Sequence, residues 1–447
     1  MTMERQAVTI FWFRRDLRLE DNRGLQAALQ SPYPVVPLFI FDRTILDGLR
    51  DRNDRRVSLI HAWVGELAEQ IARCGSSFLV EHGTPEEVFT RLVERFDVRA
   101  VYTNRDYEPM AIARDAAIER LLSQRGIPLM TFKDQCIFEA GEIRKPDGTP
   151  YTVYTPYSKA WRARLAPSDY AECRTDYLLD RLWKAEPQPI PSLEAIGFHR
   201  TSVFIPPLDT SDELLARYPA ARDYPADDAT SHASIYLRFG KVSIRALVRR
   251  ALECNADAWL RELIWREFFM MILAEFPHVV TRSFHPEYDT IAWRNDEEDF
   301  RRWCEGRTGF PLVDAGMRQL NQTGTMHNRV RMVVASFLTK DLLIDWRWGE
   351  AYFAEKLLDY ELSSNNGNWQ WAAGTGCDAA PYFRVFNPLL QQAKFDPHGT
   401  YVRRWIPELG TPEYPTPMID HTVARERALD AYRHAIEASG KRPSTGH

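Results

Sequence analysis

The chain has 447 residues, 45% of them hydrophobic and 27% charged, which is the composition of an ordinary soluble protein with room for two or three domains. Disordered and fibrous architectures are therefore excluded. The formal net charge is −5, so no overall positive field draws the chain onto nucleic acid or an anionic membrane, and any contact with a polyanion must be a local patch.

The amino-terminal residues show no apolar core behind a basic start, and nowhere is an apolar run long enough to cross a membrane. We therefore expect a cytoplasmic protein without membrane contact. The six cysteines are spread singly with no Cys-x-x-Cys motif, which argues against a disulfide framework and against a zinc site. We expect core thiols and no bound metal.

Short apolar runs alternate with helical patterns over the first 135 residues, which is typical of a doubly wound parallel sheet. Helix 85–96 has a well-defined start, because Thr84 and Glu87 form a capping box around Pro85. The predicted strands are 8–13, 35–41, 77–81, 100–104 and 129–132, with helices near 56–74, 85–96 and 110–125.

The first predicted strand is followed by the charged loop Phe13–Leu19 instead of a Gly-x-Gly-x-x-Gly motif. An ordinary dinucleotide-binding oxidoreductase is therefore disfavoured. A solvated turn is the simplest alternative for this loop.

Residues 136–208 lose periodicity and are punctuated by prolines, so they are predicted as a linker between an α/β domain over 1–135 and an all-α domain over 209–447. The predicted helices of the second domain are 243–254, 257–276, 311–322, 328–343 and 349–359.

Helix 257–276 gathers a carboxylate, a cation and two indoles. Trp259, Glu262 and Arg266 fall at i, i+3 and i+7 and share one face, and Trp265 lies one step to the side. This set suits a binding site, but it also fits an amphipathic surface with a common Glu–Arg pair.

Two further segments carry candidate functional residues. Asn328, Arg331 and Met332 share a face in a basic stretch, which suits phosphate contact or plain solvation. The Gly- and Asn-rich segment Asn365–Trp371 is predicted to be a binding loop, because Gly and Asn permit unusual backbone geometry. Buried tryptophan is the alternative explanation for that segment.

Five motifs together resemble the photolyase/cryptochrome family. They are Trp12 to Arg18, Trp265-Arg266-Glu267-Phe268, Thr308 to Ala315, Met326-His327-Asn328-Arg329, and Asn365-Asn366-Gly367 followed by Ala379 to Pro388. The resemblance covers essentially the whole chain in order. It implies an α/β antenna domain, a long linker and an all-α domain that holds FAD, in agreement with the organisation above.

The resemblance implies a set of FAD contacts, with Asn365 facing flavin N5. These contacts carry over onto Tyr218, Thr230, Ser231, His232, Ala233, Ser234, Trp259, Glu262, Arg266, Arg331, Asp341, Asp359, Glu361 and Asn365. The Thr-Ser-x-Leu-Ser-Pro pattern of the family is altered at Ala233 and Ile235, and Glu361 and Thr325 stand where Asp and Trp are usual. The fine FAD contacts therefore stay open.

The resemblance also implies a lyase that repairs cyclobutane pyrimidine dimers in DNA with light. Glu262 would hydrogen-bond the carbonyls of a flipped-out dimer, and Trp369, Trp346 and Trp293 would form an electron-transfer chain to the flavin. Contacts to DNA and to the dimer carry over onto Arg222, Trp265, Arg266, Asn328, Arg329, Met332, Trp371 and Arg384. Trp265 and Trp371 would supply the aromatic walls on which flipped bases stack.

Two other functions within the family remain as alternatives. A photolyase of (6-4) photoproducts is disfavoured, because its two histidines are replaced here by Asn328 and Met332. A cryptochrome-type blue-light receptor is disfavoured by the retained pocket, which consists of Glu262, Trp265, Asn328, Met332 and Trp371.

The resemblance leaves the antenna chromophore open. Deazaflavin, FMN and methenyltetrahydrofolate are the candidates for the first domain, and Glu108-Pro109 is closer to the deazaflavin and FMN types. We expect ultraviolet-damaged DNA as the partner and a monomeric protein.

Overall fold

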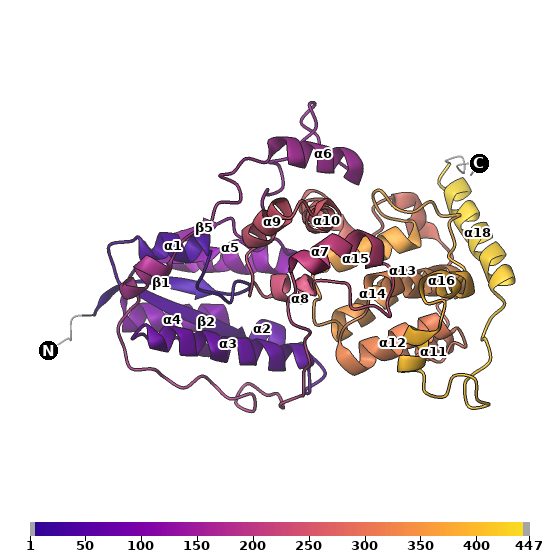
Figure 1. Cartoon of the computed structure of the whole chain (residues 1–447). Coiled ribbons are helices and arrows are strands. Elements are labelled where there is room, and N and C mark those ends of the chain that lie inside the picture. Colours follow the sequence, from indigo (N-terminus) through magenta and orange to yellow (C-terminus); the bar gives the residue numbers. More distant parts are fainter. Residues whose placement is uncertain (1–4, 441–447) are drawn as a thin grey trace. The chain divides into compact units, whose positions relative to one another are not determined.

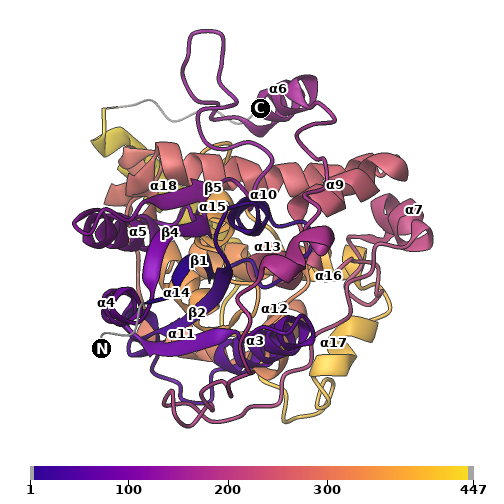
Figure 2. The ribbon, with the colours of Figure 1, turned by 90° about the vertical axis from the view of Figure 1, so that its left-hand side faces the viewer.

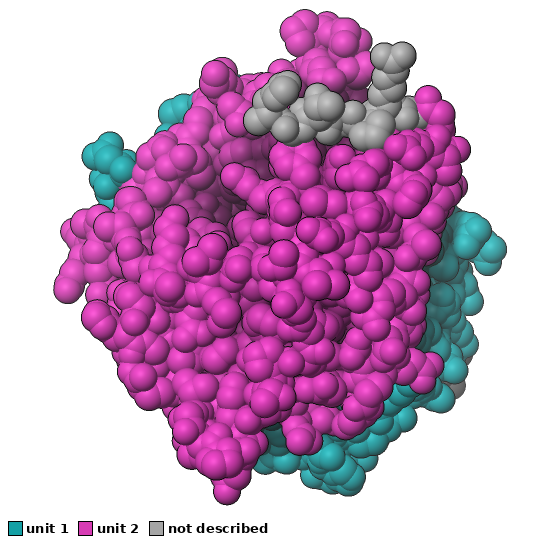
Figure 3. Space-filling model, turned by 90° about the vertical axis from the view of Figure 1, so that its right-hand side faces the viewer, with its two compact units in different colours: residues 1–139, 164–208, 232–255 teal, residues 140–163, 209–231, 256–447 magenta. Residues whose placement is uncertain are grey.

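The computed structural model describes residues 5–440, which pack as two compact units. Of the described residues, the first unit contains 5–139, 164–208 and 232–255, and the second contains 140–163, 209–231 and 256–440 (Figure 3). Each unit takes part of the predicted linker, so the limits drawn at 136 and 208 stay a prediction.

The first unit contains the predicted doubly wound sheet. Its strands are all parallel, in the order β3-β2-β1-β4-β5. They are β1 (Ala7–Phe13), β2 (Val35–Asp42), β3 (Leu79–Gly83), β4 (Asp97–Asn104) and β5 (Leu129–Phe132). The strand order reverses beside β1, and the carboxyl ends of β1 and β4 therefore form the place where doubly wound folds bind ligands.

Helices cover both faces of this sheet (Figure 2). One face packs against α4 (Pro85–Arg95) and α5 (Pro109–Ser123), and the other against α1 (Arg23–Leu29) and α3 (Arg55–Arg73). Helix α4 starts with the predicted capping box. The remaining helices of the unit are α2 (Arg43–Leu46), the 3-10 helix Asp176–Arg181, α8 (Ala233–Arg238) and α9 (Ile244–Glu253).

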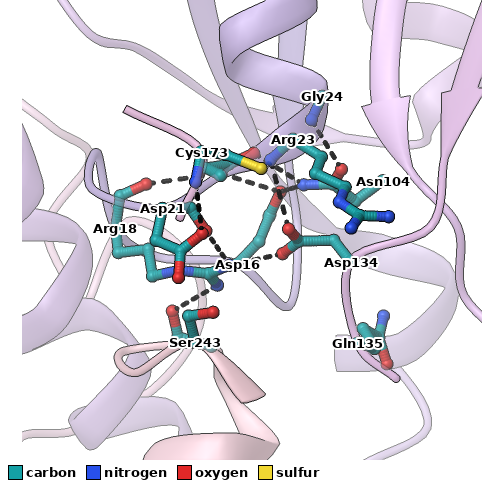
Figure 4. Close-up of polar contacts among 12 residues, drawn as sticks. Asp16, Arg18, Asp21, Arg23, Gly24, Asn104, Asp134, Gln135, Cys173 and Ser243 are labelled. Carbon is teal, nitrogen blue, oxygen red and sulfur yellow. Dashed lines mark hydrogen bonds and ion pairs between the residues drawn. The ribbon is translucent and has the colours of Figure 1, made fainter. Parts of the chain in front are cut away.

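A buried ionic network explains why residues 232–255, predicted in the helical half, pack with the sheet. Arg245 of α9 is 1% exposed and donates to Asp21 (Nε to Oδ1, 2.9 Å) and to Asp134 (Nη2 to Oδ1, 2.7 Å). Arg18 also donates to Asp134 at 2.5 Å (Figure 4). Burial by itself would raise the pKa of Asp21, but the charge of Arg245 lowers it to about 2.

The second unit is built from helices, as predicted (Figure 1). Its core includes Trp303, Trp346 and Trp369. The helices are α6 (Tyr154–Arg164), α7 (Asp212–Ala221), α10 (Asp257–Glu275), α11 (Glu297–Glu305), α12 (Pro311–Thr323), α13 (Asn328–Ser336), α14 (Trp346–Lys356), α15 (Leu362–Ala373), α16 (Pro388–Phe395), α17 (Thr400–Trp405) and α18 (His421–Ala438). Short 3-10 helices occupy Pro277–Val280 and Pro286–Thr290.

One prediction for this unit is wrong, and one helix departs from it in its last turn. Asn365–Trp371 is not a loop but lies inside helix α15, where Gly367 serves close packing: a Cβ there would lie 2.1 Å from Cδ1 of Phe269 on α10. The predicted helix 328–343 ends as an α-helix at Ser336 and continues as the π-helical turn Phe337–Asp341.

Within residues 5–440, no helix is long and apolar enough to span a membrane. The same residues contain no group of three or more His, Cys, Asp or Glu side chains placed to hold a metal ion. The sequence prediction about the amino terminus rests partly on residues 1–4, which lie outside the described residues.

Candidate active site

Helices α7 and α10 bring Glu262 and Arg222 together. Arg222 caps the C-terminus of α7 and donates from Nη1 to Oε1 of Glu262, and its guanidinium carbon lies 5.2 Å from the ring centroid of Tyr218. Burial by itself would lower the pKa of Arg222, but the hydrogen bond and charge of Glu262 raise it. Glu262 therefore pairs with Arg222 and not with Arg266, the helix neighbour that the sequence allowed.

Two arginines predicted to bind the cofactor are each paired with a predicted carboxylate. Arg266 Nη2 lies 2.8 Å from Oε1 of Glu361, and Arg331 Nη2 lies 2.9 Å from Oδ2 of Asp359. Glu361 also accepts from the Ser364 hydroxyl at 3.2 Å. The structure thus places four of the predicted residues in two ion pairs, which join the middle of α10 and the first half of α13 to the segment that leads into α15.

The predicted phosphate-binding segment is divided between the two units. In the second unit the Trp259 indole N–H donates to the Ser231 hydroxyl at 3.0 Å, and Thr230 is half-buried beside it. The other three predicted contacts belong to the first unit. They are His232, which has a left-handed backbone (φ 54°), and Ala233 and Ser234, which begin α8.

Asn365 lies one turn into α15 and is buried. Its Nδ2 donates to the Glu350 carboxylate (2.9 Å) and to the Glu350 backbone carbonyl (3.1 Å). Burial raises the pKa of Glu350, and the hydrogen bond from Asn365 only partly offsets that rise. Glu350 therefore fixes the direction in which the Asn365 amide points.

Asp341 is fully buried and has a partner that the sequence analysis did not consider. His421 Nδ1, at the start of α18, lies 2.5 Å from Oδ1 of Asp341. Burial raises the pKa of Asp341, against the opposing effect of His421. In the described chain, Oδ2 of Asp341 is a buried atom without a hydrogen-bond partner.

Trp265 is half-buried and its indole stacks on Tyr154 of α6, with ring centroids 3.6 Å apart and planes 5° from parallel. Phe268 meets the indole edge-on at 5.6 Å, and Phe269 stacks at 5.5 Å with an offset. The predicted aromatic wall is therefore already held by other aromatic rings.

Helix α13 presents the next group of predicted residues. Asn328 begins the helix and is exposed, and Arg329 Nη2 lies 2.9 Å from Asp223. Arg329 also donates to the Met332 sulfur at 3.6 Å and lies 4.3 Å above the Phe395 ring. Arg329 thus joins α13 to α16 and to the loop after α7.

The last two predicted substrate residues lie in α15 and beyond it. Trp371 is half-buried in α15, whereas Arg384 is exposed in the segment before α16. Within the described residues neither of them forms a hydrogen bond, ion pair or ring contact with Glu262 or Trp265, so their part in a common pocket stays a prediction.

The three tryptophans of the predicted electron-transfer chain belong to the core of the second unit or pack against it. Trp369 and Trp346 are buried, and Trp293 is half-buried. The Trp369 ring lies 6.1 Å from Trp303 and 5.0 Å from Phe353. Trp303 is thus an additional aromatic neighbour that the sequence analysis did not identify.

Charged residues crowd the carboxyl ends of β1 and β4 in the first unit. Arg15 donates to Asp106 (3.2 Å) and Glu108 (3.1 Å), and Arg238 donates to Glu108 (2.8 Å). Burial by itself would raise the pKa of Asp106, but Arg15 and Arg14 hold it well below its usual range. The place where a doubly wound sheet binds ligands is therefore lined by arginines and carboxylates that pair with one another.

Sequence reasoning missed Glu350, Tyr154 and His421, which hold Asn365, Trp265 and Asp341 in place. Tyr154 lies where the periodicity fades, and Glu350 is one charge among many on an amphipathic helix. Only the aromatic Tyr154 in a proline-rich segment offered a signal, and that signal is weak.

Comparisons with known proteins cover most of the chain. Residues 9–175 match the DNA photolyase family, and residues 259–412 match the FAD binding domain of DNA photolyase. The deoxyribodipyrimidine photo-lyase of Vibrio cholerae is 37% identical over 95% of this chain and 99% of its own length.

Two solved structures are similar over nearly their full length. A bacterial class III photolyase from Agrobacterium tumefaciens superposes with a TM-score of 0.87 at 34% identity, covering 98% of this chain and 99% of that one. An archaeal photolyase from Sulfolobus tokodaii, solved with two FAD molecules, gives a TM-score of 0.81 at 34% identity, covering 95% of this chain and 99% of that one.

Proposed function

Because the chain belongs to the photolyase/cryptochrome family, we propose that it is a lyase that splits cyclobutane pyrimidine dimers in DNA with light. The observation that carries this proposal is Glu262, held by Arg222 next to the aromatic wall of Trp265 on the same helix. The relatives supporting it are named as deoxyribodipyrimidine photo-lyases.

FAD is the cofactor of the family domain that matches residues 259–412, and the side chains of this chain fit it. Arginines and hydroxyls suit a diphosphate, a side-chain amide suits the polar edge of a flavin, and the unpartnered buried oxygen of Asp341 can be satisfied by a ligand. The residues that would hold FAD are Tyr218, Thr230, Ser231, Trp259, Arg266, Arg331, Asp341, Asp359, Glu361 and Asn365. When bound, FAD supplies the light-driven electron transfer that opens the dimer.

Glu262 acts on the substrate side of this site. We assign its carboxyl group, acting as an O–H donor in the complex, to a hydrogen bond with a carbonyl oxygen of the flipped dimer, where negative charge gathers as the cyclobutane ring opens. In the free protein Arg222 occupies the Glu262 carboxylate, so the dimer must enter beside this pair or displace part of it. Asn328 and Met332, in place of two histidines, support a cyclobutane dimer over a (6-4) photoproduct.

The test uses full-length protein carrying reduced FAD and an oligonucleotide with one thymine dimer. Illumination should restore the two thymines, and no repair should occur in the dark. Glu262→Ala should slow repair by about tenfold or more, since it removes a group that stabilises developing charge. Glu355→Ala, on the exposed face of α14, is the matched control and should repair like the wild type. An unchanged rate in Glu262→Ala would remove Glu262 from the site.

Three finer properties belong to the same proposal. A second, antenna chromophore would lie at the carboxyl ends of β1 and β4, and an absorption spectrum of the purified protein would identify it as deazaflavin, FMN or a folate. A monomer in the cytoplasm is the expected state, and analytical ultracentrifugation should then give a single species near 51.9 kDa.

A further inference from the structure

We propose that Tyr154 is a positioning residue for substrate recognition, because it backs the Trp265 indole and sets which of its faces can receive a flipped pyrimidine. This inference rests on the proposed function, since it takes Trp265 to be a wall of the dimer site. Tyr154 lies in the segment 140–163, which the sequence analysis treated as a linker.

The stack between the two rings is unusually close and flat. Their centroids are 3.6 Å apart and their planes differ by 5°, whereas free aromatic pairs prefer an offset or an edge-to-face arrangement. A base cannot enter between rings at this spacing. The dimer must therefore contact the part of the Trp265 indole that is covered neither by Tyr154 nor by Phe269, whose ring stacks at a centroid distance of 5.5 Å.

Hydrogen bonds at both ends of Tyr154 hold its ring against the indole. The phenol donates to the Arg261 carbonyl at 2.8 Å, and the Tyr154 backbone N–H donates to the Asp378 carboxylate at 2.9 Å. Burial, with a contribution from the charge of Glu262, raises the pKa of Tyr154 to about 12, so the phenol keeps the proton that it donates.

The result is an indole with little freedom to rotate. Tyr154 covers one face, Phe268 packs against the edge, and Phe269 stacks on the indole at 5.5 Å. A wall fixed before the substrate arrives loses no rotational freedom on binding, which favours the complex with the dimer over a looser contact.

Other residues of the segment 140–163 also bind helix α10, so the role of Tyr154 can be separated from the attachment of the segment to that helix. The Trp161 indole N–H donates to Glu267 at 2.6 Å, and Arg144 forms a 2.6 Å ion pair with Glu275. Replacing Tyr154 removes the stack and leaves these contacts in place.

The experiment measures binding of full-length, FAD-loaded protein to a single-stranded oligonucleotide with one thymine dimer and to the same oligonucleotide without it. Tyr154→Leu should weaken binding of the dimer oligonucleotide by about tenfold, within the range of one lost base–aromatic stack, and leave binding of the undamaged one unchanged. Tyr154→Phe keeps the ring and should bind nearly as well as the wild type. Arg144→Ala, the control, breaks an anchor of the same segment and should leave both affinities unchanged.

Two further readouts separate positioning from a general structural role. In steady-state repair Tyr154→Leu should raise KM for the dimer and leave the light-saturated kcat unchanged. With 5-fluorotryptophan incorporated at the 13 tryptophans, the resonance that Trp265→Phe deletes should shift in Tyr154→Leu and stay in place in Arg144→Ala. Tyr154→Met, a replacement of different shape, serves in both measurements where the leucine variant does not fold.

Equal losses on both oligonucleotides, or an unchanged affinity for the dimer together with a shifted fluorine resonance, would overturn the positioning role. A wild-type protein that shows no preference for the dimer oligonucleotide and no light-driven repair would instead refute the proposed function. In that case the fluorine resonance would still report whether the two rings stack.

Discussion

Single side chains in this protein are oriented by partners far away in sequence, and Asn365 is an example. Its amide donates to the Glu350 carboxylate, which Glu350→Ala removes. We expect Glu350→Ala to lower the free energy of unfolding by about 0.5–1.5 kcal/mol, the usual value of one net hydrogen bond, and Glu350→Gln to keep the acceptor. Urea unfolding of both variants measures this. Equal destabilisation by Ala and Gln would mean that the hydrogen bond carries no stability.

The raised pKa of Glu350 gives the pH dependence a definite sign. The charged form is penalised in the folded protein, so the cost is absent below the pKa of the unfolded chain and grows as the pH rises towards the folded pKa. Glu350→Gln lacks this cost and should gain stability relative to the wild type as the pH rises from acid to neutral. A stability difference that does not change with pH would contradict the assignment.

Trp369 offers a test of the electron route. It is buried in contact with Trp303 and Phe353. We expect Trp369→Phe to stop light-driven reduction of oxidised FAD and to leave repair by chemically reduced protein nearly intact, because the proposed tryptophan chain would deliver electrons to the flavin without touching the substrate. Transient absorption after a light pulse measures the first process. Trp303→Phe tests the alternative branch and should leave photoreduction in place if the route runs through Trp346 and Trp293.

At the scale of elements, α10 and α15 approach so closely that only glycine fits between them. Gly→Ala inside a helix normally stabilises it by about 1 kcal/mol, yet at Gly367 the new methyl group would lie 2.1 Å from Phe269. We expect Gly367→Ala to lower the free energy of unfolding by about 1–3 kcal/mol through overpacking. Gly65→Ala in α3 is the control, because its nearest neighbour is 3.7 Å away, and it should be neutral or stabilising. Thermal or urea unfolding of the two variants decides between strain and helix propensity.

At the scale of the whole molecule, the buried network around Arg245 decides which unit α9 belongs to. Arg245→Met leaves Asp21 and Asp134 without their shared cation and should destabilise the protein by about 3 kcal/mol or more. Arg301→Met, which removes an exposed arginine from surface ion pairs, should cost less than about 1 kcal/mol. Urea unfolding of the two variants gives the comparison, and similar losses would show that the buried network is no more stabilising than a surface pair.

The same network predicts sensitivity to acid. The folded pKa of Asp21, about 2, lies below its ordinary value of 3.8, so its ionised form stabilises the protein by about 2 kcal/mol above pH 4. This contribution should be lost as the pH falls through that interval, and the gap in stability between wild type and Arg245→Met should narrow there. Burial raises the pKa of Asp16, so its contribution to stability changes with pH in the opposite direction. This contribution is the same in wild type and in Arg245→Met and does not change the gap between them. A gap that stays constant down to pH 2 would contradict this account.

Much of the architecture follows from local sequence pattern. The continuous apolar run at residues 8–13 predicts a buried parallel strand, and Thr84 with Glu87 predicts where α4 begins, because these signals act within a few residues. The family, its α/β and all-α domains, its lyase activity and its FAD were likewise predicted from ordered motifs and are confirmed. The assignment of individual site residues stays a prediction.

The sequence by itself therefore determined the strands, most helices and the set of chemical groups available, because apolar periodicity and capping are local. Only the tertiary structure decided which groups meet. Glu262 pairs with Arg222, 40 positions away, and not with its helix neighbour Arg266. Helix α9 packs with the sheet because Arg245 donates a hydrogen bond to Asp21, 224 positions away. The Tyr154 ring stacks on the Trp265 indole. Such partners depend on how whole helices pack, and no local pattern records the distance between two side chains that the fold brings together.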